Sequence, residues 1–195
     1  VCSSDLGVLV VEDDDDFCFL IGDTLGREPD MRILGSTASG EEAVYLAQRL
    51  DPDIVLMDLN LSLEELDGIE AARKIRLYTR AKVILVTAFE AQSIVIDACK
   101  RSFASSYVFK SQFSILTETV RQTAEGPTPQ EYLIASLILA DLSPAEQSVC
   151  LMMLGRDVHL QSSQKTIANQ KTALLNKLGL KSQKELEHLF HGMQV

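Results

Sequence analysis

Five short apolar runs alternate with five amphipathic stretches along the first two thirds of the chain, and this alternation restricts the possible folds most. The runs are rich in β-branched residues and are continuous, as in strands buried on both faces of a sheet. The runs are residues 8–11, 31–35, 53–57, 82–86 and 106–109. The stretches are residues 15–27, 40–50, 68–78, 91–102 and 112–124. This order predicts an α/β fold, a doubly wound five-stranded parallel sheet with helices on both faces.

The composition changes at Gly126-Pro127-Thr128-Pro129, where two prolines within three residues favour an extended linker. After this point the patterns are helical only, with a serine-proline start at residue 143 and a glycine stop at residue 179. Helices are expected at 131–140, 144–154, 164–178 and 183–190. We therefore expect a first domain over residues 1–124, a linker and linker helix over 125–141, and a small all-α domain over 142–195.

The charge is divided unevenly between these parts. The net charge of −10 falls entirely on residues 1–125, whereas residues 126–195 carry equal numbers of acidic and basic side chains. All lysines of the second part lie between Lys165 and Lys184, so this stretch alone has the charge to approach nucleic acid.

Other features argue against whole classes of protein. No apolar run is long enough to span a bilayer, and no basic-then-apolar leader is visible. The four cysteines lack CxxC spacing, which argues against a zinc site or a disulfide framework. Together these features predict a cytoplasmic protein.

Polar side chains follow four of the predicted strands. Glu12 and Asp13 follow the first, Asp58 the third, Thr87 the fourth and Lys110 the fifth. Because the carboxyl ends of parallel strands meet at one edge of a sheet, these side chains should converge. Three carboxylates without a basic neighbour in sequence favour Mg²⁺, which prefers oxygen ligands. A carboxylate beside Mg²⁺ can form an aspartyl-phosphate, with the lysine and the hydroxyl contacting phosphoryl oxygens.

An ordinary structural interpretation exists for each of these residues. An acid after a strand is commonly a helix cap, and the run 13–16 could be a solvated helix start. The conjunction of all of them, each at its own strand end, favours a functional site instead.

A resemblance to response-regulator receiver domains covers residues 6–124. The segments that carry it are LVVEDD at 9–14, DIVLMDLNL at 53–61, DGIEAARKIR at 67–76, VILVTA at 83–88 and YVFK at 107–110. The resemblance implies a flavodoxin-like fold with Asp58 as phosphoacceptor. It implies Mg²⁺ ligation by Glu12, Asp13, Asp58 and the backbone carbonyl of Asn60. It also implies Thr87 and Tyr107 as a switch pair and Lys110 as the phosphate-contacting lysine.

The chain departs from that family at three places near the site, one of which is Glu12 in place of the commoner aspartate, a change that these domains tolerate. The segment from Asp58 to Gly68 is about two residues longer than the family pattern, and Ser62 stands where proline is usual. The added residues Leu63, Glu64 and Glu65 are expected to alter access to Asp58. Ser111 follows Lys110 in place of a proline. A cis peptide bond before a residue other than proline costs about 3 kcal/mol, so a cis bond is not expected there.

Two later segments resemble the LuxR-type helix-turn-helix of NarL/FixJ regulators. They are LSPAEQSVCLMMLG at 142–155 and SQKTIANQKTALLNKLGL at 163–180. The second would be the recognition helix, whose DNA-facing residues would be Lys165, Thr166, Asn169 and Gln170, with Lys177 adding a phosphate contact. A helical bundle with a merely solvated lysine face is the plainer alternative.

The stretch between these segments, residues 156–162, is about five residues shorter than the family pattern. Seven residues make at most about two helical turns, so the helix that braces the recognition helix is truncated or lost. DNA affinity should therefore be weaker or altered.

The sequence as a whole predicts a non-enzymatic response regulator in which Asp58 catalyses only its own phosphorylation and dephosphorylation. The expected partners are a sensor histidine kinase, DNA and, after phosphorylation, a second copy of the chain. Two alternatives keep the receiver: an output domain that acts through protein–protein interaction, or a receiver that serves as a phosphate sink. A hydrolase is disfavoured, since Asn60 stands where related phosphatases need a second acid.

Overall fold

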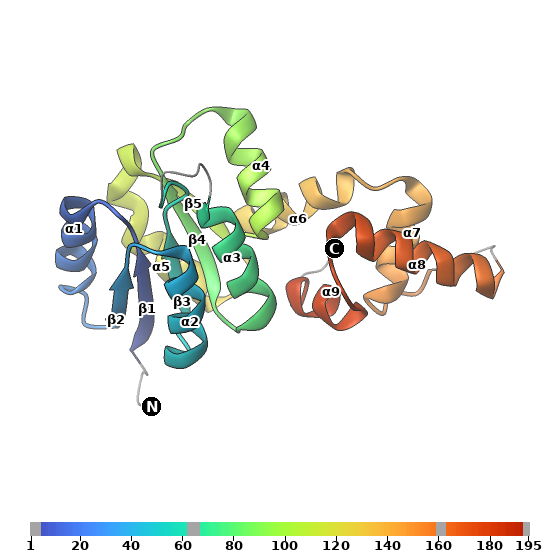
Figure 1. Cartoon of the computed structure of the whole chain (residues 1–195), viewed down its shortest axis with the longest axis horizontal. Coiled ribbons are helices and arrows are strands. Elements are labelled where there is room, and N and C mark those ends of the chain that lie inside the picture. The colour runs from blue at the N-terminus through green and yellow to red at the C-terminus, as the bar shows by residue number, and fades with distance from the viewer. Residues whose placement is uncertain (1–4, 62–66, 159–162, 193–195) are drawn as a thin grey trace. The chain divides into compact units, whose positions relative to one another are not determined.

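The computed structural model describes residues 5–61, 67–158 and 163–192. The chain forms two compact units, residues 1–134 and residues 135–195 (Figure 1). Each unit has its own buried core. The division falls inside one helix, α6, so no break in secondary structure separates the units.

The first unit is built on a five-stranded parallel sheet of order β2-β1-β3-β4-β5 (Figure 1). Its strands are β1 Leu6–Val11, β2 Met31–Thr37, β3 Ile54–Met57, β4 Lys82–Thr87 and β5 Ser106–Phe109. The order reverses direction beside β1, as the doubly wound prediction requires. The predicted fold is confirmed, although β2 runs two residues further than expected and its register with β1 shifts between Val8 and Leu9.

Helices cover both faces of the sheet. They are α1 Asp15–Leu25, α2 Gly40–Leu50, α3 Asp67–Tyr78, α4 Gln92–Ser102 and α5 Leu116–Glu125. Ile21 and Leu25 of α1 and Leu116 and Val120 of α5 share one apolar cluster with Val8 and its neighbours in the sheet. The helices α2, α3 and α4 pack side by side on the opposite face (Figure 1). The strands that carry the site residues at their ends are thus held between two layers of helices.

The segment after β5 differs from its prediction. A helix was expected from residue 112, but a 3-10 helix spans Lys110–Ile115 and the α-helix begins only at Leu116. Gln112 has non-helical φ and ψ angles within this segment, which places the kink there. All peptide bonds of the described residues are trans, including the bond after Lys110.

The linker helix also begins earlier than predicted. The helix α6 spans Pro129–Ala140, whereas the sequence predicted an extended linker over residues 126–129 and a helix from residue 131. Thr128 explains the difference, because its hydroxyl accepts a hydrogen bond from the backbone N–H of Glu131 at 3.1 Å. Proline suits the first position of a helix, where its missing N–H costs nothing. A residue taken for a helix breaker therefore starts the helix.

The second unit is all-helical, as predicted. Its helices are α7 Pro144–Met153, α8 Gln164–Leu178 and α9 Gln183–Leu189. Ser143 and Glu146 form a reciprocal capping box at the start of α7, and Gly179 ends α8 with a φ of 65°. The core joins side chains of all three helices, among them Val149, Met153, Leu174, Leu186 and Leu189. Together with the sheet of the first unit, this unit confirms the predicted fold class.

None of the helices in the described part of the chain has the length and apolarity needed to cross a membrane.

Candidate functional site

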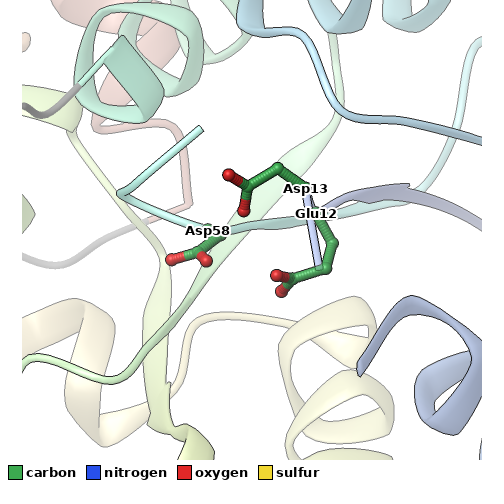
Figure 2. Close-up of side chains that lie close together, drawn as sticks. All are labelled: Glu12, Asp13 and Asp58. Atoms are coloured by element: carbon green, nitrogen blue, oxygen red, sulfur yellow. The ribbon is translucent and has the colours of Figure 1, made fainter. Parts of the chain in front are cut away.

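Three carboxylates meet at the carboxyl edge of the sheet, as Figure 2 shows for Glu12, Asp13 and Asp58. One ligand atom from each lies within 4.8 Å of the others. The sheet ladder sets this meeting, because the backbone N–H of Asp58 donates to the carbonyl of Val11 at 2.9 Å. The predicted convergence of these three residues is therefore present.

The three carboxylates differ in their exposure to solvent. Glu12 and Asp58 are each 4% exposed, whereas Asp13 is exposed. Burial raises the pKa of Glu12, and the charge of Asp58 raises it further, while the hydrogen bond from Lys110 acts in the opposite direction. The Oε2 atom of Glu12 is buried without a hydrogen-bond partner among the described residues. A buried, unsatisfied oxygen beside two further carboxylates fits a hard divalent cation.

Lys110 is the cation that bridges the two buried carboxylates. Its Nζ atom donates to Glu12 Oε1 and to Asp58 Oδ2, each at 2.7 Å. Burial disfavours the ammonium, but the hydrogen bonds to Asp58 and Glu12 and the attraction of both carboxylates outweigh it, so the pKa of Lys110 is raised. Lys110 follows β5 directly. The fold therefore brings a residue from the last strand of the sheet into contact with Glu12, which follows the first strand.

An aromatic ring completes the surroundings of Lys110. The Nζ atom lies 4.6 Å from the centroid of the Phe17 ring. Phe17 belongs to the first turn of α1, where its backbone N–H donates to the cap residue Asp14 at 3.0 Å. The rings of Phe113 and Phe17 meet in an edge-to-face arrangement, with their centroids 5.3 Å apart.

The backbone around Asp58 is tightly packed. The N–H of Asn60 donates to Asp58 Oδ1 at 3.3 Å. A Cβ atom on Gly68 would lie 2.0 Å from the carbonyl oxygen of Asp58. The longer loop predicted to alter access to Asp58, with Ser62, Leu63, Glu64 and Glu65, lies outside the described residues.

Thr87 and Tyr107, the predicted switch pair, lie on neighbouring strands. Thr87 is buried at the end of β4, and its Oγ1 accepts a hydrogen bond from the N–H of Phe89 at 3.0 Å. Tyr107 is half-buried on the edge strand β5, with its ring centroid 5.5 Å from that of Phe109. Its backbone N–H donates to Gln130 Oε1 at 3.1 Å.

Phe17 and Gly68 are the site residues that the sequence did not single out. Phe17 is the first aromatic residue after four aspartates, which is the only sequence signal for it. Gly68 lies one residue inside α3, where a glycine is unfavourable unless a close contact requires it.

The predicted DNA-facing residues lie on α8. Lys165, Thr166 and Asn169 are exposed, whereas Gln170 is half-buried and lies one turn before the fully buried Leu174. The hydroxyl of Thr166 lies 2.9 Å from that of the helix cap Ser163.

Lys177 already has a partner within its unit. Its Nζ atom lies 2.9 Å from Glu146 Oε2 on α7, so this pair ties two helices together. Residues 154–158, which follow α7, are not helical, and residues 159–162 lie outside the described part of the chain.

Comparisons with known proteins agree with this geometry. A family model of the response regulator receiver domain matches residues 8–121. The transcriptional regulatory protein LiaR of Bacillus subtilis is 31% identical over 137 residues, which are 69% of this chain and 64% of LiaR. The chain thus spans less than two thirds of the length of this relative. These matches confirm the resemblance to response regulators.

Solved structures extend the comparison. A LuxR-family two-component response regulator from Aurantimonas sp. SI85-9A1 is 27% identical, with a TM-score of 0.59, over 71% of this chain and 98% of that one. The RcsB response regulator of Salmonella typhimurium is 21% identical, with a TM-score of 0.56, over 94% of this chain and 97% of that one. The RcsB match concerns the fold, and it includes the helices of the second unit.

Proposed function

The chain belongs to the response regulator receiver family, and from this premise we propose that Asp58 accepts a phosphoryl group from a sensor histidine kinase and thereby regulates transcription. The observation that carries the proposal is the site itself. Three carboxylates lie within 4.8 Å of one another, and Lys110 is hydrogen-bonded to two of them. No enzymatic turnover of a separate substrate is needed for this role.

The chemistry is an in-line transfer to Asp58. Its carboxylate oxygen forms the new P–O bond while the P–N bond to the donor imidazole breaks, and the imidazole leaves neutral after taking one proton. Glu12, Asp13, Asp58 and the Asn60 backbone carbonyl would hold Mg²⁺, which neutralises charge on the phosphoryl oxygens when bound.

Lys110 and Thr87 would contact the transferred group. The Lys110 ammonium, now bridging Glu12 and Asp58, would exchange one carboxylate partner for a phosphoryl oxygen. The buried hydroxyl of Thr87 at the end of β4 would donate to another. The side chain of Tyr107, on the neighbouring strand, would then move together with that of Thr87. In this way the phosphoryl group would shift the balance between two receiver conformations.

The output is proposed to be DNA binding by α8, with Lys165, Thr166, Asn169, Gln170 and Lys177 facing the duplex. The exposed polar face of this helix and the name of LiaR as a transcriptional regulator support it. A palindromic operator would require a homodimer, formed after phosphorylation. The proposed location is the cytoplasm.

A second candidate function is an output that acts through protein–protein interaction. Two observations favour it: residues 154–158 are not helical, and Lys177 is engaged by Glu146. A receiver that only stores phosphate is the third possibility. Gel shifts of genomic fragments with phosphorylated and unphosphorylated chain separate the first function from the other two.

The test of the central proposal is intact mass after incubation with acetyl phosphate and Mg²⁺. The wild-type chain should gain one phosphoryl group, and Asp58→Asn should gain none. Asp97→Asn, an exposed aspartate on α4, is the matched control and should behave as wild type. Equal phosphorylation of Asp58→Asn and wild type would overturn the assignment.

A further inference from the structure

We propose that Phe17 is a positioning residue for Lys110, holding its ammonium over the ring so that it faces Asp58 and Glu12; this inference rests on the proposed function. The Nζ atom lies 4.6 Å from the ring centroid and 2.7 Å from each carboxylate oxygen. An ammonium over an aromatic face is attracted by the negative charge of the ring face. A lysine side chain is flexible, so a fixed ring restricts the positions that its ammonium group can take.

The ring itself is held from two sides. Its backbone is fixed in the first turn of α1 by the Asp14 cap, and its ring packs against that of Phe113 at an interplanar angle of 72°. Phe113 belongs to the 3-10 helix that begins at Lys110. The ring thus joins the segment after Asp13 to the segment after Lys110.

An aromatic face suits a lysine that must change partners. The ring attracts the ammonium without donating or accepting an ordinary hydrogen bond, so it leaves the N–H groups for the carboxylates or a phosphoryl oxygen. A carboxylate in its place would compete with the phosphoryl group for Lys110.

The test compares Phe17→Leu, which keeps an apolar side chain, with Phe17→Tyr, which keeps the ring. The rate of phosphorylation of the full chain by acetyl phosphate should fall about two- to fivefold in Phe17→Leu and stay near wild type in Phe17→Tyr. Phe19→Leu is the control, because Phe19 is on the same helix and 75% exposed. A ring-current shift of the Lys110 ε-methylene protons should be present in wild type and absent in Phe17→Leu.

Two results would overturn the role of Phe17: a wild-type rate in Phe17→Leu, or an equal loss in Phe17→Leu and Phe17→Tyr. An absent ring-current shift in wild type would do the same. A wild-type chain that gains no phosphoryl group would instead refute the proposed function, and the ring-current shift would then decide the position of Lys110 by itself.

From an independent set of contacts we also propose that the segment 126–134 is a fixed part of the receiver unit, in which Gln130 connects β5 with α6. The Oε1 atom of Gln130 accepts hydrogen bonds from the backbone N–H of Tyr107, at 3.1 Å, and from the hydroxyl of Ser106. Since β5 is an edge strand, this side chain satisfies an N–H that no neighbouring strand reaches.

Charged contacts fix the same segment. Glu131 is 3% exposed and lies between Lys82, at 3.1 Å, and Arg76, at 3.7 Å. The Nζ atom of Lys82 also donates to the carbonyl of Gly126 at 2.8 Å. The first turn of α6 is therefore bound to the start of β4 and to α3 as well as to β5.

The consequence concerns signal transmission. Lys110 follows β5 directly, so an exchange of its partners at the phosphorylation site acts on that strand. Gln130 binds the other end of the strand, and α6 continues from there into the second unit without a break. A displacement of β5 would thus reach the first turn of α6, a helix that continues to Ala140.

The measurement is hydrogen exchange of the full chain with and without Mg²⁺ and beryllofluoride, a phosphoryl analogue. Wild type should show changed exchange of the α6 amides on activation, and Gln130→Ala should lose most of that change. Gln122→Ala is the control, since Gln122 is exposed on α5 and contacts only Glu118 of its own helix among the contacts observed.

The possible outcomes distinguish a failure of the proposed coupling between β5 and α6 from a failure of the proposed phosphorylation site. A response at Thr87 and Lys110 without one in α6, or an α6 response unchanged in Gln130→Ala, would overturn the coupling. A chain that responds nowhere to beryllofluoride would refute the phosphorylation site itself.

Discussion

Gly68 approaches Asp58 so closely that a Cβ atom at Gly68 would lie 2.0 Å from the Asp58 carbonyl oxygen. The clash would be with backbone rather than with the end of a flexible side chain, so relief requires movement of the chain that carries the phosphoacceptor. The identity of residue 68 and the position of Asp58 are therefore coupled, although Gly68 contributes no functional group.

We expect Gly68→Ala to destabilise the chain by about 1–3 kcal/mol, because overpacking forces a backbone shift. Chemical denaturation measures this free energy of unfolding. Gly126→Ala is the matched control, since a Cβ there meets no atom within 4 Å and the backbone is extended. Equal stability of the two variants would contradict the close packing around Asp58.

Glu131→Ala should be among the most damaging substitutions in the first unit. It would leave the guanidinium of Arg76 buried without its carboxylate partner, and breaking a buried pair in this way costs about 3–5 kcal/mol. Burial already lowers the pKa of Arg76, against the raising effect of Glu131. Thermal unfolding of Glu131→Ala and of the exposed control Glu125→Ala measures the difference, and a loss no larger than the control's would argue against a buried network.

Much of this architecture could be predicted from sequence, because it depends on local patterns. Continuous β-branched runs such as Ile54–Met57 identified the buried strands, and Ser143 with Glu146 identified the start of α7. The convergence of Glu12 and Asp58 followed from a general rule about parallel sheets, without knowledge of their separation.

Contacts between distant segments could not be predicted in the same way. In the sequence, Gln130 and Glu131 look like ordinary polar residues at the start of a helix. In the structure, Gln130 is hydrogen-bonded to β5, and Glu131 is buried between two cationic side chains. The ring of Phe17 likewise meets Lys110 only because α1 and the segment after β5 adjoin in the fold. Such contacts depend on how the helices pack on the sheet, which one sequence does not specify.

Mg²⁺ should bind the free chain weakly, and two substitutions should change its affinity in opposite directions. Asp13→Asn removes a charged ligand and should weaken binding several-fold. Lys110→Met removes an ammonium that bridges Glu12 and Asp58, so it should strengthen binding. Titration followed by NMR tests both, with the exposed Asp16→Asn as control. Weaker binding in Lys110→Met would contradict competition between the ammonium and the cation.

The carboxyl of Glu146 should titrate far below an ordinary glutamate. Hydrogen bonds from Lys177, and then from the backbone and hydroxyl of Ser143, lower its pKa to about 2. Because the folded pKa is depressed, its stabilising effect is complete above the unfolded value near 4.5 and is lost as the pH falls through about 2. Carboxyl ¹³C NMR measures the pKa directly, and Lys177→Met should raise it. An unchanged pKa in that variant would remove Lys177 as the main cause.

DNA binding by the second unit should be weaker than in a complete helix-turn-helix, and Glu146 should limit it. The carboxylate of Glu146 holds Lys177 at 2.9 Å, which withholds one cation from the phosphate backbone. Glu146→Gln keeps a side chain suited to the capping box but frees Lys177. In a salt series on a candidate operator, this variant should steepen the dependence of log affinity on log salt by about one unit.

Two further variants in that series separate the kinds of contact. Lys165→Ala should flatten the dependence of log affinity on log salt by about one unit. It should also weaken binding to all DNA sequences alike, as loss of a phosphate contact does. Asn169→Ala should relax discrimination at one base pair by about 1–3 kcal/mol, because an amide reads a base edge. Glu187→Gln is the control for Glu146→Gln, since Glu187 lies on α9 and its observed contact is with Gln183. If neither the wild type nor Glu146→Gln binds DNA at any salt concentration, even when phosphorylated, α8 is not a recognition helix. That result would favour the two alternatives without DNA binding, an output through protein partners or a receiver that only stores phosphate.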